Sequence, residues 1–188
     1  MAKTLDVILV IDVESTCWEG YPPPGQMTEI IEVGLCLVDT ASLERLEKRS
    51  LMVRPQKSTV SAFCTELTGI TQEMLADAPA FPEAMEALRE AMLVGRWGVV
   101  WGSWGLFDQT QLRRDCDFHG VEYPMPEHMN LKNVFSAAQG RRKRYGMSKA
   151  LRLCGLGLEG SHHRALDDAK NIARLLPWIV GGQRLPTT

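Results

Sequence analysis

The sequence predicts an α/β fold with a mixed central sheet, in which an antiparallel three-strand meander is joined by parallel strands and flanked by helices. Three observations support this prediction. Three β-type runs follow one another in the first third of the chain, and helix-type segments alternate with a strand-type segment afterwards. No repeat, low-complexity tract or linker interrupts the 188 residues. We therefore expect one domain that covers residues 1–188.

Four segments have the pattern of strands. Val7–Ile11 is a continuous apolar run, which is typical of a strand buried on both faces. Segments 29–39 and 45–55 follow it and are joined by a tight link near Asp39–Ser42, which predicts the antiparallel meander. The segment WGVVWGS, residues 97–103, predicts a further short buried strand.

Helix signals cover most of the remaining chain. Thr71 is placed to cap a helix with Glu73 in its first turn, and Pro82 stands at the first turn of a helix whose apolar residues Met85, Leu88 and Met92 have helical spacing. Gly140 is placed to end another helix. The predicted helices are 71–78, 81–93, 107–118, 130–140, 146–156 and 165–180.

Composition limits the class of protein. The chain is 45% hydrophobic and 23% charged, and it has neither a stretch near transmembrane length nor a visible signal peptide, so we expect no membrane partner. Five scattered cysteines without a CxxC pair favour neither a zinc site nor a disulfide framework, which indicates a reduced, cytoplasmic setting. The formal net charge of −2 means that any contact with nucleic acid must use a local basic patch.

Two acids stand at the end of the first predicted strand. Side chains two residues apart in a strand share a face, so Asp12 and Glu14 lie side by side and repel each other unless a cation or a proton separates them. Their oxygen ligands suit hard cations such as Mg²⁺ or Mn²⁺. Taken alone, such a pair is very common, and the beginning of a solvated polar loop would be the better interpretation.

The C-terminal helix adds a third acid to this argument. Asp168 lies one turn before Ile172, on the apolar stripe of the predicted helix. A carboxylate in such a position needs a partner, and a metal ion shared with Asp12 would be one. Asp167 falls on the polar face and is interpreted as a helix N-terminal acid. His163 belongs to the preceding loop, free to reach the same site, and His162 is interpreted as structural.

A fourth acid, Asp108, follows a short buried strand and opens a helix. Functional residues of α/β proteins gather at this edge of the sheet, although Asp108 could also be a first-turn helix acid.

Taken in order, VIDVES, WGLFD and HHRALDD resemble the three motifs of the DEDDh 3′→5′ exonucleases, the DnaQ-like branch of the ribonuclease H-like fold. Asp12 and Glu14 match the first motif, Asp108 the second, and His163 with Asp168 the third. The chain looks most similar to the enhanced-RNAi-type RNA exonucleases. It departs from the usual second motif in having Ser103 and Trp104 near the position of an asparagine, and Gly105 where many members of that group have an aspartate.

The resemblance implies a metal-dependent exonuclease that releases nucleoside 5′-monophosphates from the 3′ ends of single-stranded nucleic acid, with RNA favoured. Asp12, Glu14, Asp108 and Asp168 would hold two Mg²⁺ or Mn²⁺ ions about 3.5–4 Å apart. Glu14 is also assigned to catalysis, and His163 would be the general base.

Substrate contacts follow from the same resemblance and from charge. The segment with Leu67, Thr68, Gly69 and Ile70 would flank the terminal nucleotide, or it could be a plain turn. Trp104 could stack on a base. The loop that begins with Arg141 and Arg142 and continues through Lys143 and Arg144 would contact phosphates, although a solvated charge run is the ordinary interpretation.

Two alternatives remain open. One is a DNA-directed proofreading or repair exonuclease of the same fold. RNA and DNA differ at the 2′ hydroxyl, and no residue in the sequence indicates whether the protein recognises that group. A catalytically silent nucleic-acid-binding protein would be expected to have lost one of the five motif residues, all of which are present.

Overall fold

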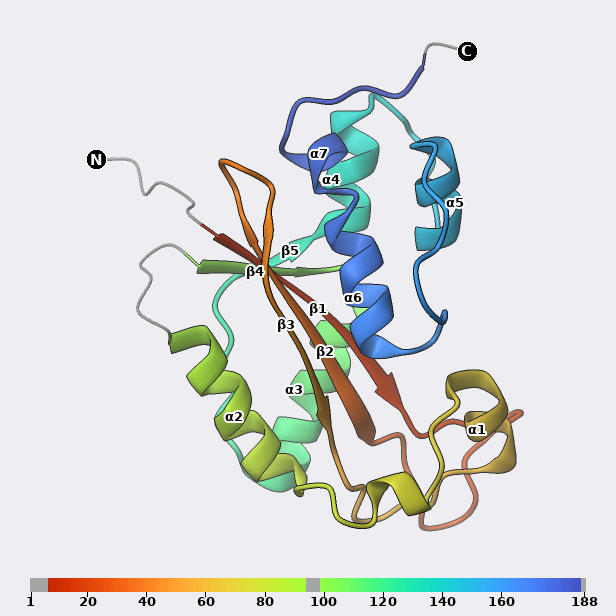
Figure 1. Cartoon of the computed structure of the whole chain (residues 1–188). Helices are drawn as coiled ribbons and strands as arrows, with labels where there is room; N and C mark the ends of the chain where they lie inside the picture. Colours follow the sequence, from red (N-terminus) through yellow and green to blue (C-terminus); the bar gives the residue numbers. More distant parts are fainter. Residues whose placement is uncertain (1–6, 94–98, 187–188) are drawn as a thin grey trace.

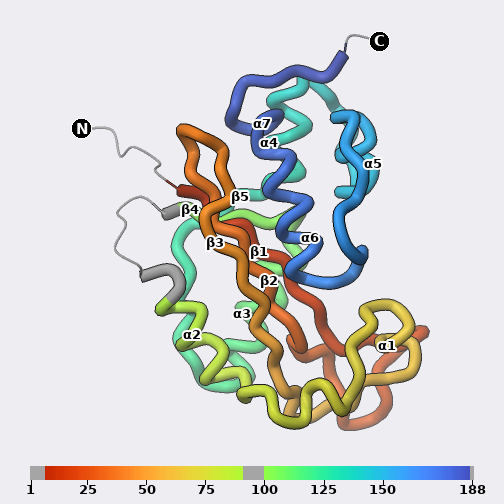
Figure 2. The backbone as a smooth tube through the Cα atoms, in the orientation of Figure 1, coloured from red at the N-terminus to blue at the C-terminus, as the bar shows by residue number. Residues whose placement is uncertain are grey.

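A computed structural model describes residues 7–93 and 99–186 of the chain (Figures 1 and 2). In these residues five strands form one sheet in the order β3-β2-β1-β4-β5. The strands are β1 (Val7–Ser15), β2 (Ile30–Asp39), β3 (Arg45–Met52), β4 (Val99–Ser103) and β5 (His128–Asn130). The first three pair antiparallel, whereas β4 pairs parallel with both β1 and β5. The predicted mixed sheet is therefore confirmed.

The helices of the described residues begin and end close to most of the predicted positions. They are α1 (Ala62–Thr68), the 3₁₀ turn η1 (Glu73–Leu75), α2 (Phe81–Leu93), α3 (Phe107–His119), α4 (Leu131–Ala138), α5 (Met147–Leu153), α6 (Ala165–Ala173) and α7 (Leu176–Ile179). Trp97 and Gly98 of the predicted fourth strand segment lie outside the described residues, as does the side chain of Met92. None of the described helices is long and apolar enough to cross a membrane.

Two helix predictions need correction, and one helix was not predicted. Segment 71–78 forms only the turn η1, because Ala78 precedes Pro79 and the α conformation is disfavoured before proline. Segment 165–180 is two helices, since Pro177 has no N–H for the carbonyl of Ala173 and its ring crowds that carbonyl. The short helix α1 was not predicted; the Ser61 side chain caps its start, and Gly69 ends it in the left-handed conformation.

The sheet separates two apolar cores. On β1, Ile8 and Val10 face the core shared with α4–α7, while Leu9 and Ile11 face the core shared with α2 and α3. Figure 1 shows these two groups of helices on opposite sides of the sheet. The alternation confirms that β1 is buried on both faces, and it places the next even-numbered residue, Asp12, on the side of α6.

A glycine lets α6 lie directly against the sheet. Gly34 of β2 pairs with Asp12 of β1, and a Cβ atom at Gly34 would stand 2.0 Å from the backbone carbonyl carbon of Ala165, the first residue of α6. Only a residue without a side chain permits this approach. The start of α6, and with it Asp168, is thereby held beside the end of β1.

Candidate active site

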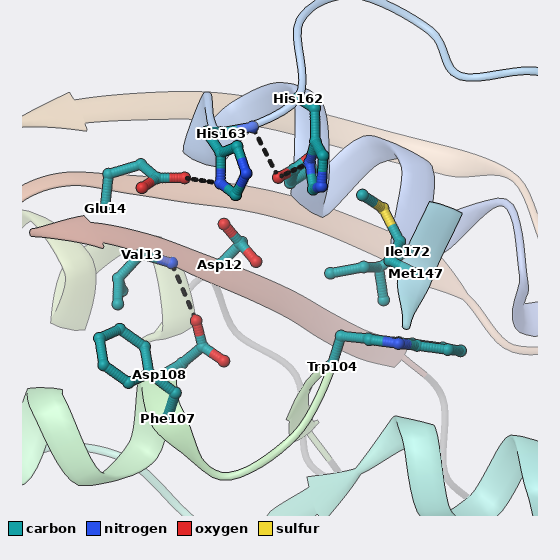
Figure 3. Close-up of a pocket in the computed structure, with 11 residues that line it drawn as sticks. Asp12, Val13, Glu14, Trp104, Phe107, Asp108, Met147, His162, His163 and Ile172 are labelled. Carbon is teal, nitrogen blue, oxygen red and sulfur yellow. Dashed lines mark hydrogen bonds and ion pairs between the residues drawn. The ribbon is translucent and has the colours of Figure 1, made fainter. Parts of the chain in front are cut away.

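Asp12 and Glu14 lie side by side where β1 leaves the centre of the sheet. Both project toward α6, as their spacing predicts, and both line an open pocket of about 340 Å³ (Figure 3). Glu14 is 9% exposed and Asp12 is partly buried. Val13 of the same strand also lines the pocket, and the remaining lining residues come from other parts of the chain: Trp104, Phe107, Asp108, Met147, His162, His163, Asp168 and Ile172.

Asp168 reaches the pocket from the first turn of α6 and is 4% exposed. One oxygen from each of Asp12, Glu14 and Asp168 lies within 4.8 Å of the others. Asp12 and Asp168 are 156 positions apart in the chain, and they therefore place ligand atoms close together, as predicted from the sequence.

Glu32, a residue that the sequence analysis did not single out, holds the start of α6 in place. Its fully buried carboxylate accepts hydrogen bonds from the backbone N–H of Ala165 at 3.1 Å and from Nε of Arg164 at 3.1 Å. The Ser50 hydroxyl donates to its other oxygen at 2.6 Å. The signal available in the sequence was an acid inside the apolar run of β2.

Asp108 stands in the first turn of α3, just beyond the end of β4. Its Oδ1 atom accepts a hydrogen bond of 3.0 Å from the backbone N–H of Val13, which fixes the carboxylate against β1 (Figure 3). Since β4 runs parallel to β1, the ends of both strands meet at this edge of the sheet. Asp108 thus lines the same pocket as the other three acids.

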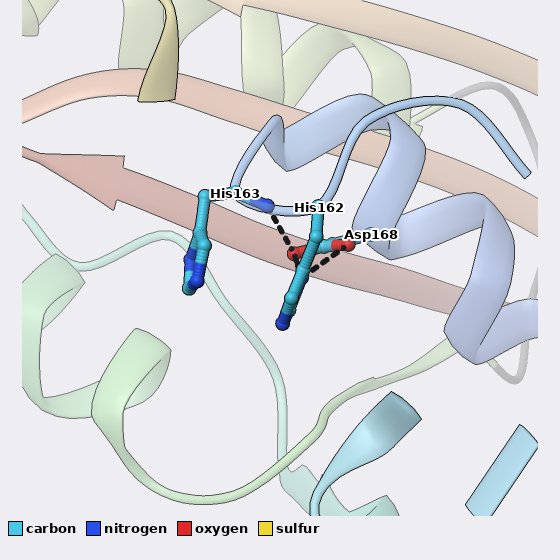
Figure 4. A group of neighbouring side chains, drawn as sticks. All are labelled: His162, His163 and Asp168. Carbon is cyan, nitrogen blue, oxygen red and sulfur yellow. Dashed lines mark hydrogen bonds and ion pairs between the residues drawn. The ribbon is translucent and has the colours of Figure 1, made fainter. Parts of the chain in front are cut away.

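His163 lies on the loop before α6, as expected, with a left-handed backbone (φ 64°) that is uncommon outside glycine. Its N–H donates to Oδ2 of Asp168 at 3.0 Å, and its Nδ1 is 4.0 Å from Oε1 of Glu14. The hydrogen bond stabilises the strained backbone and directs the imidazole into the pocket (Figures 3 and 4).

His162, which was interpreted from the sequence as structural, lines the same pocket. Nδ1 of His162 lies 2.8 Å and 3.1 Å from the two oxygens of Asp168, and its ring stacks on that of His163 with centroids 4.0 Å apart (Figure 4). His162 therefore contacts two of the motif residues. In the sequence His162 simply adjoins the motif residue His163, and no spacing pattern indicates its contacts with Asp168 and His163.

Asp167 shows the opposite behaviour and confirms its interpretation as a helix N-terminal acid. It accepts hydrogen bonds from the Ser161 backbone N–H and from the Lys170 ammonium, at 2.9 Å and 2.7 Å. Burial acts to raise its pKa, but these two donors outweigh burial and leave the pKa below its usual range.

The pKa values of the four acids in the pocket are raised above their usual values. Loss of hydration and the neighbouring Asp108, Asp168 and Glu14 carboxylates raise the pKa of Asp12 well above its usual value. Burial and the same kind of repulsion raise the pKa of Glu14 to about 8. Burial also raises the pKa values of Asp108 and Asp168, against the hydrogen bonds that each accepts. Four acids in one pocket are stable as carboxylates only if cations replace the missing solvation.

A divalent cation fits this donor set. The ligand atoms are carboxylate oxygens, which hard cations prefer, and the acids repel one another in its absence. His163 has the complementary property. Its burial, together with His162, lowers its pKa, so the imidazole is neutral at pH 7 and able to accept a proton.

The predicted substrate residues are distributed unevenly. Trp104 lines the pocket, with its Nε1 donating to the carbonyl of Tyr145 at 3.0 Å. Leu67 on α1 is 38% exposed, whereas Thr68 and Ile70 are buried and Gly69 ends α1. Arg141 and Arg142 follow α4 and do not line this pocket.

The chain is similar in sequence and in structure to known proteins. A family model described as "Exonuclease" matches residues 9–176. The rat protein "3'-5' exoribonuclease 1" is 33% identical over 90% of this chain and 52% of its own length, so the chain spans about half of that relative. The Bacillus subtilis "Probable 3'-5' exonuclease KapD" is 31% identical over 94% of this chain and 85% of its own length.

One solved structure is similar over its whole length. It is the nuclease domain of 3'hExo, described as a DEDDh family member bound to rAMP, with a TM-score of 0.84 and 29% identity. The match covers 98% of this chain and 97% of that one.

Proposed function

The chain belongs to the exonuclease family, and on that premise we propose that it is a metal-dependent 3′→5′ exonuclease that removes nucleoside 5′-monophosphates from single-stranded RNA. The observation that carries this proposal is the convergence of Asp12, Glu14, Asp108, His163 and Asp168 in one open pocket. Similar proteins named exoribonucleases and a relative solved with rAMP support RNA as the favoured substrate. A DNA-directed exonuclease of the same fold is the second candidate.

The four carboxylates are proposed to hold two divalent cations, Mg²⁺ or Mn²⁺. Asp12 stands between Glu14, Asp108 and Asp168 and is the acid best placed to serve both ions. When bound, such cations supply Lewis acidity, which lowers the pKa of an attacking water and stabilises charge that develops on the phosphate and on the leaving oxygen. Glu14 contributes to catalysis through this binding and through its position beside His163.

His163 performs the proton transfer of the proposed reaction. Its neutral imidazole accepts a proton from the water whose oxygen bonds to the terminal phosphorus. The bond between phosphorus and the 3′ oxygen of the preceding nucleotide breaks, and that oxygen takes up a proton to become the new 3′ hydroxyl. The product is a nucleoside 5′-monophosphate and a strand that is one residue shorter.

The apolar side of the pocket is suited to the terminal nucleoside. Trp104, Met147 and Ile172 line one side of it together, Phe107 stands beside Asp108, and the Trp104 ring is held by its bond to Tyr145 (Figure 3). Aromatic stacking is worth about 1–3 kcal/mol per base and tolerates any base. This wall therefore supports an enzyme that removes successive nucleotides whatever their sequence.

The direct test uses 3′-end-labelled single-stranded RNA, single-stranded DNA and RNA hairpins with Mg²⁺, Mn²⁺ or EDTA. We expect the wild type to release labelled 5′-monophosphate from RNA only with a cation, and Asp12→Asn to release none. Asp117→Asn, which changes an exposed acid on α3, serves as the matched control and should remain active. Binding of RNA without hydrolysis under every condition would instead indicate a silent nucleic-acid-binding protein.

A further inference from the structure

Positive charge is concentrated in one part of the chain. Between His128 and Leu158 there are seven Lys and Arg residues and no Asp or Glu, although the chain as a whole has a net charge of −2. The residues are Lys132, Arg141, Arg142, Lys143, Arg144, Lys149 and Arg152. None of the seven forms an ion pair with a described residue, and neither does Arg184 after α7. The segments α4 and α5 and the C-terminal segment after α7 therefore carry an excess of positive charge.

A second hollow lies on this surface. It has a volume of about 500 Å³ and is formed where the end of α5 meets α7 and the segment that follows. We call it the distal pocket; it is lined by Arg152, Leu153, Cys154, Gly155, Trp178, Gln183, Arg184 and Pro186. Two guanidinium groups and a partly exposed indole share this space. Guanidinium groups bind phosphate oxygens, and an indole face stacks on bases.

Helix α5 connects the distal pocket to the catalytic pocket. Its first residue, Met147, lines the catalytic pocket, and its last turn with Arg152 lines the distal one. Seven residues of helix span about 10 Å, so the two hollows are only a few nucleotides apart. Figure 1 shows α5 beside α6, with the C-terminal segment passing over its far end.

We propose that the distal pocket is a second nucleic-acid site, which holds upstream nucleotides of a single-stranded RNA whose 3′ end occupies the catalytic pocket. This proposal rests on the proposed function, because the catalytic pocket defines which end of the strand is held. Arg152 and Arg184 contact phosphates, and Trp178 stacks on a base. The site binds upstream nucleotides that a dinucleotide lacks, so long strands bind more tightly. It therefore sets the length preference of the enzyme and leaves the hydrolysis step unchanged.

The variant Arg152→Gln/Arg184→Gln tests the proposal by removing two exposed cations. Its matched control is Lys48→Gln/Arg54→Gln, which removes two exposed cations from the β3 side of the molecule. Binding of fluorescein-labelled RNA, from two to twelve nucleotides long, is measured by anisotropy in EDTA, so that no hydrolysis occurs. Turnover of the same RNAs is measured separately with Mn²⁺.

We expect wild-type affinity to rise with length, and Arg152→Gln/Arg184→Gln to bind the twelve-nucleotide RNA about tenfold more weakly while binding the dinucleotide unchanged. Two lost phosphate contacts should reduce the slope of log affinity against log salt by about 1.4. In turnover, KM for the long RNA should rise about tenfold at constant kcat. The control pair should match wild type in all three measurements.

Equal affinity and equal salt slope in Arg152→Gln/Arg184→Gln and wild type would overturn the distal site. Equal weakening for the dinucleotide and the long RNA would also overturn it, because the effect would then be general electrostatic attraction. If Arg152→Gln/Arg184→Gln binds inorganic phosphate or an acidic peptide more weakly than the wild type but binds RNA equally well, the distal pocket is a site for another anion and the proposal is overturned. If the wild type never cleaves RNA but binds it with this length dependence, and Arg152→Gln/Arg184→Gln loses that dependence, the exonuclease proposal fails and the distal site stands.

Discussion

His163 contacts more of the site than any other side chain on its loop: its backbone binds Asp168, and its imidazole lies between Glu14 and His162. The change His163→Ala removes only the imidazole, so the four carboxylates keep their positions. We predict a fall in kcat of about 10²–10⁴, the usual contribution of a general base. Mn²⁺ affinity by calorimetry and the thermal midpoint should both stay near wild type. Retention of near-normal turnover would remove His163 from this role.

His162 offers a graded comparison with its neighbour. It contacts Asp168 and stacks on His163, whereas Glu14 is approached by His163. We predict that His162→Ala lowers kcat by about tenfold, less than His163→Ala, because it loosens the placement of two functional groups without removing either. The activities of the two variants are compared on one RNA. A larger loss in His162→Ala would mean that the roles of the two histidines are exchanged.

The pKa of Glu14 predicts how cation binding depends on pH. Because its pKa is about 8 rather than the usual 4.5, the free protein holds a proton there at neutral pH, and a cation must displace it. Mn²⁺ affinity should therefore rise about tenfold or more per unit between pH 6 and pH 8 and level off above. Calorimetry in two buffers of different ionisation enthalpy measures the released protons. Glu14→Gln should flatten the dependence, and a flat wild-type profile would contradict the raised pKa.

The residues that were predictable from sequence are those with a periodic signal. Strand alternation placed Asp12 and Glu14 on one face, and helical spacing placed Asp168 on the inward stripe. Glu32 and His162 were missed for different reasons. Glu32 acts through a buried bond to α6 that joins positions 133 residues apart, and His162 is positioned by loop geometry that no local pattern encodes.

At the scale of elements, the contact between β2 and α6 decides where Asp168 stands. Gly34→Ala would place a methyl group 2.0 Å from the backbone of Ala165 and push α6 away from Asp12. We predict a loss of stability of about 1–3 kcal/mol, typical of overpacking, together with weaker Mn²⁺ binding. Urea unfolding and calorimetry measure the two effects.

A second glycine provides the control for this substitution. Gly157 lies on the loop before α6, and a Cβ there would meet nothing within 4 Å. Gly157→Ala should leave both the unfolding midpoint and Mn²⁺ affinity unchanged. Wild-type Mn²⁺ affinity in Gly34→Ala would show that the close approach of α6 does not position the acids.

Sequence analysis found β1–β4, α2–α5 and the region of α6 and α7, which have strand-type or helix-type patterns over several residues. The missed elements are short. β5 has three residues and no apolar run, and its existence depends on pairing with β4. Helix α1 depends on the Ser61 cap and on packing of Cys64 and Ile70 against Ile31. Tertiary contacts rather than local preference specify such elements.

At the scale of the whole molecule, the acid cluster lowers the stability of the metal-free fold and provides the ligands for cations. Burial raises the pKa values of all four acids, and repulsion by neighbouring carboxylates adds to this at Asp12 and Glu14. The cluster therefore destabilises the metal-free fold, and Asp12→Asn should raise its thermal midpoint. Each kcal/mol of relief corresponds to about 2–4 °C for a chain of this size. Mn²⁺ should raise the midpoint of the wild type but not of Asp12→Asn. A lower midpoint in metal-free Asp12→Asn would show that the cluster is stabilising as it stands.

We propose that acids from β1, α3 and α6 meet in one pocket in order to hold divalent cations. An anomalous-difference map from crystals grown with Mn²⁺ and adenosine 5′-monophosphate tests this directly. We expect two strong peaks among Asp12, Glu14, Asp108 and Asp168, with the phosphate beside them and His163 facing it. A pocket without manganese in such a map, from protein that remains folded, would show that these acids do not form a cation site.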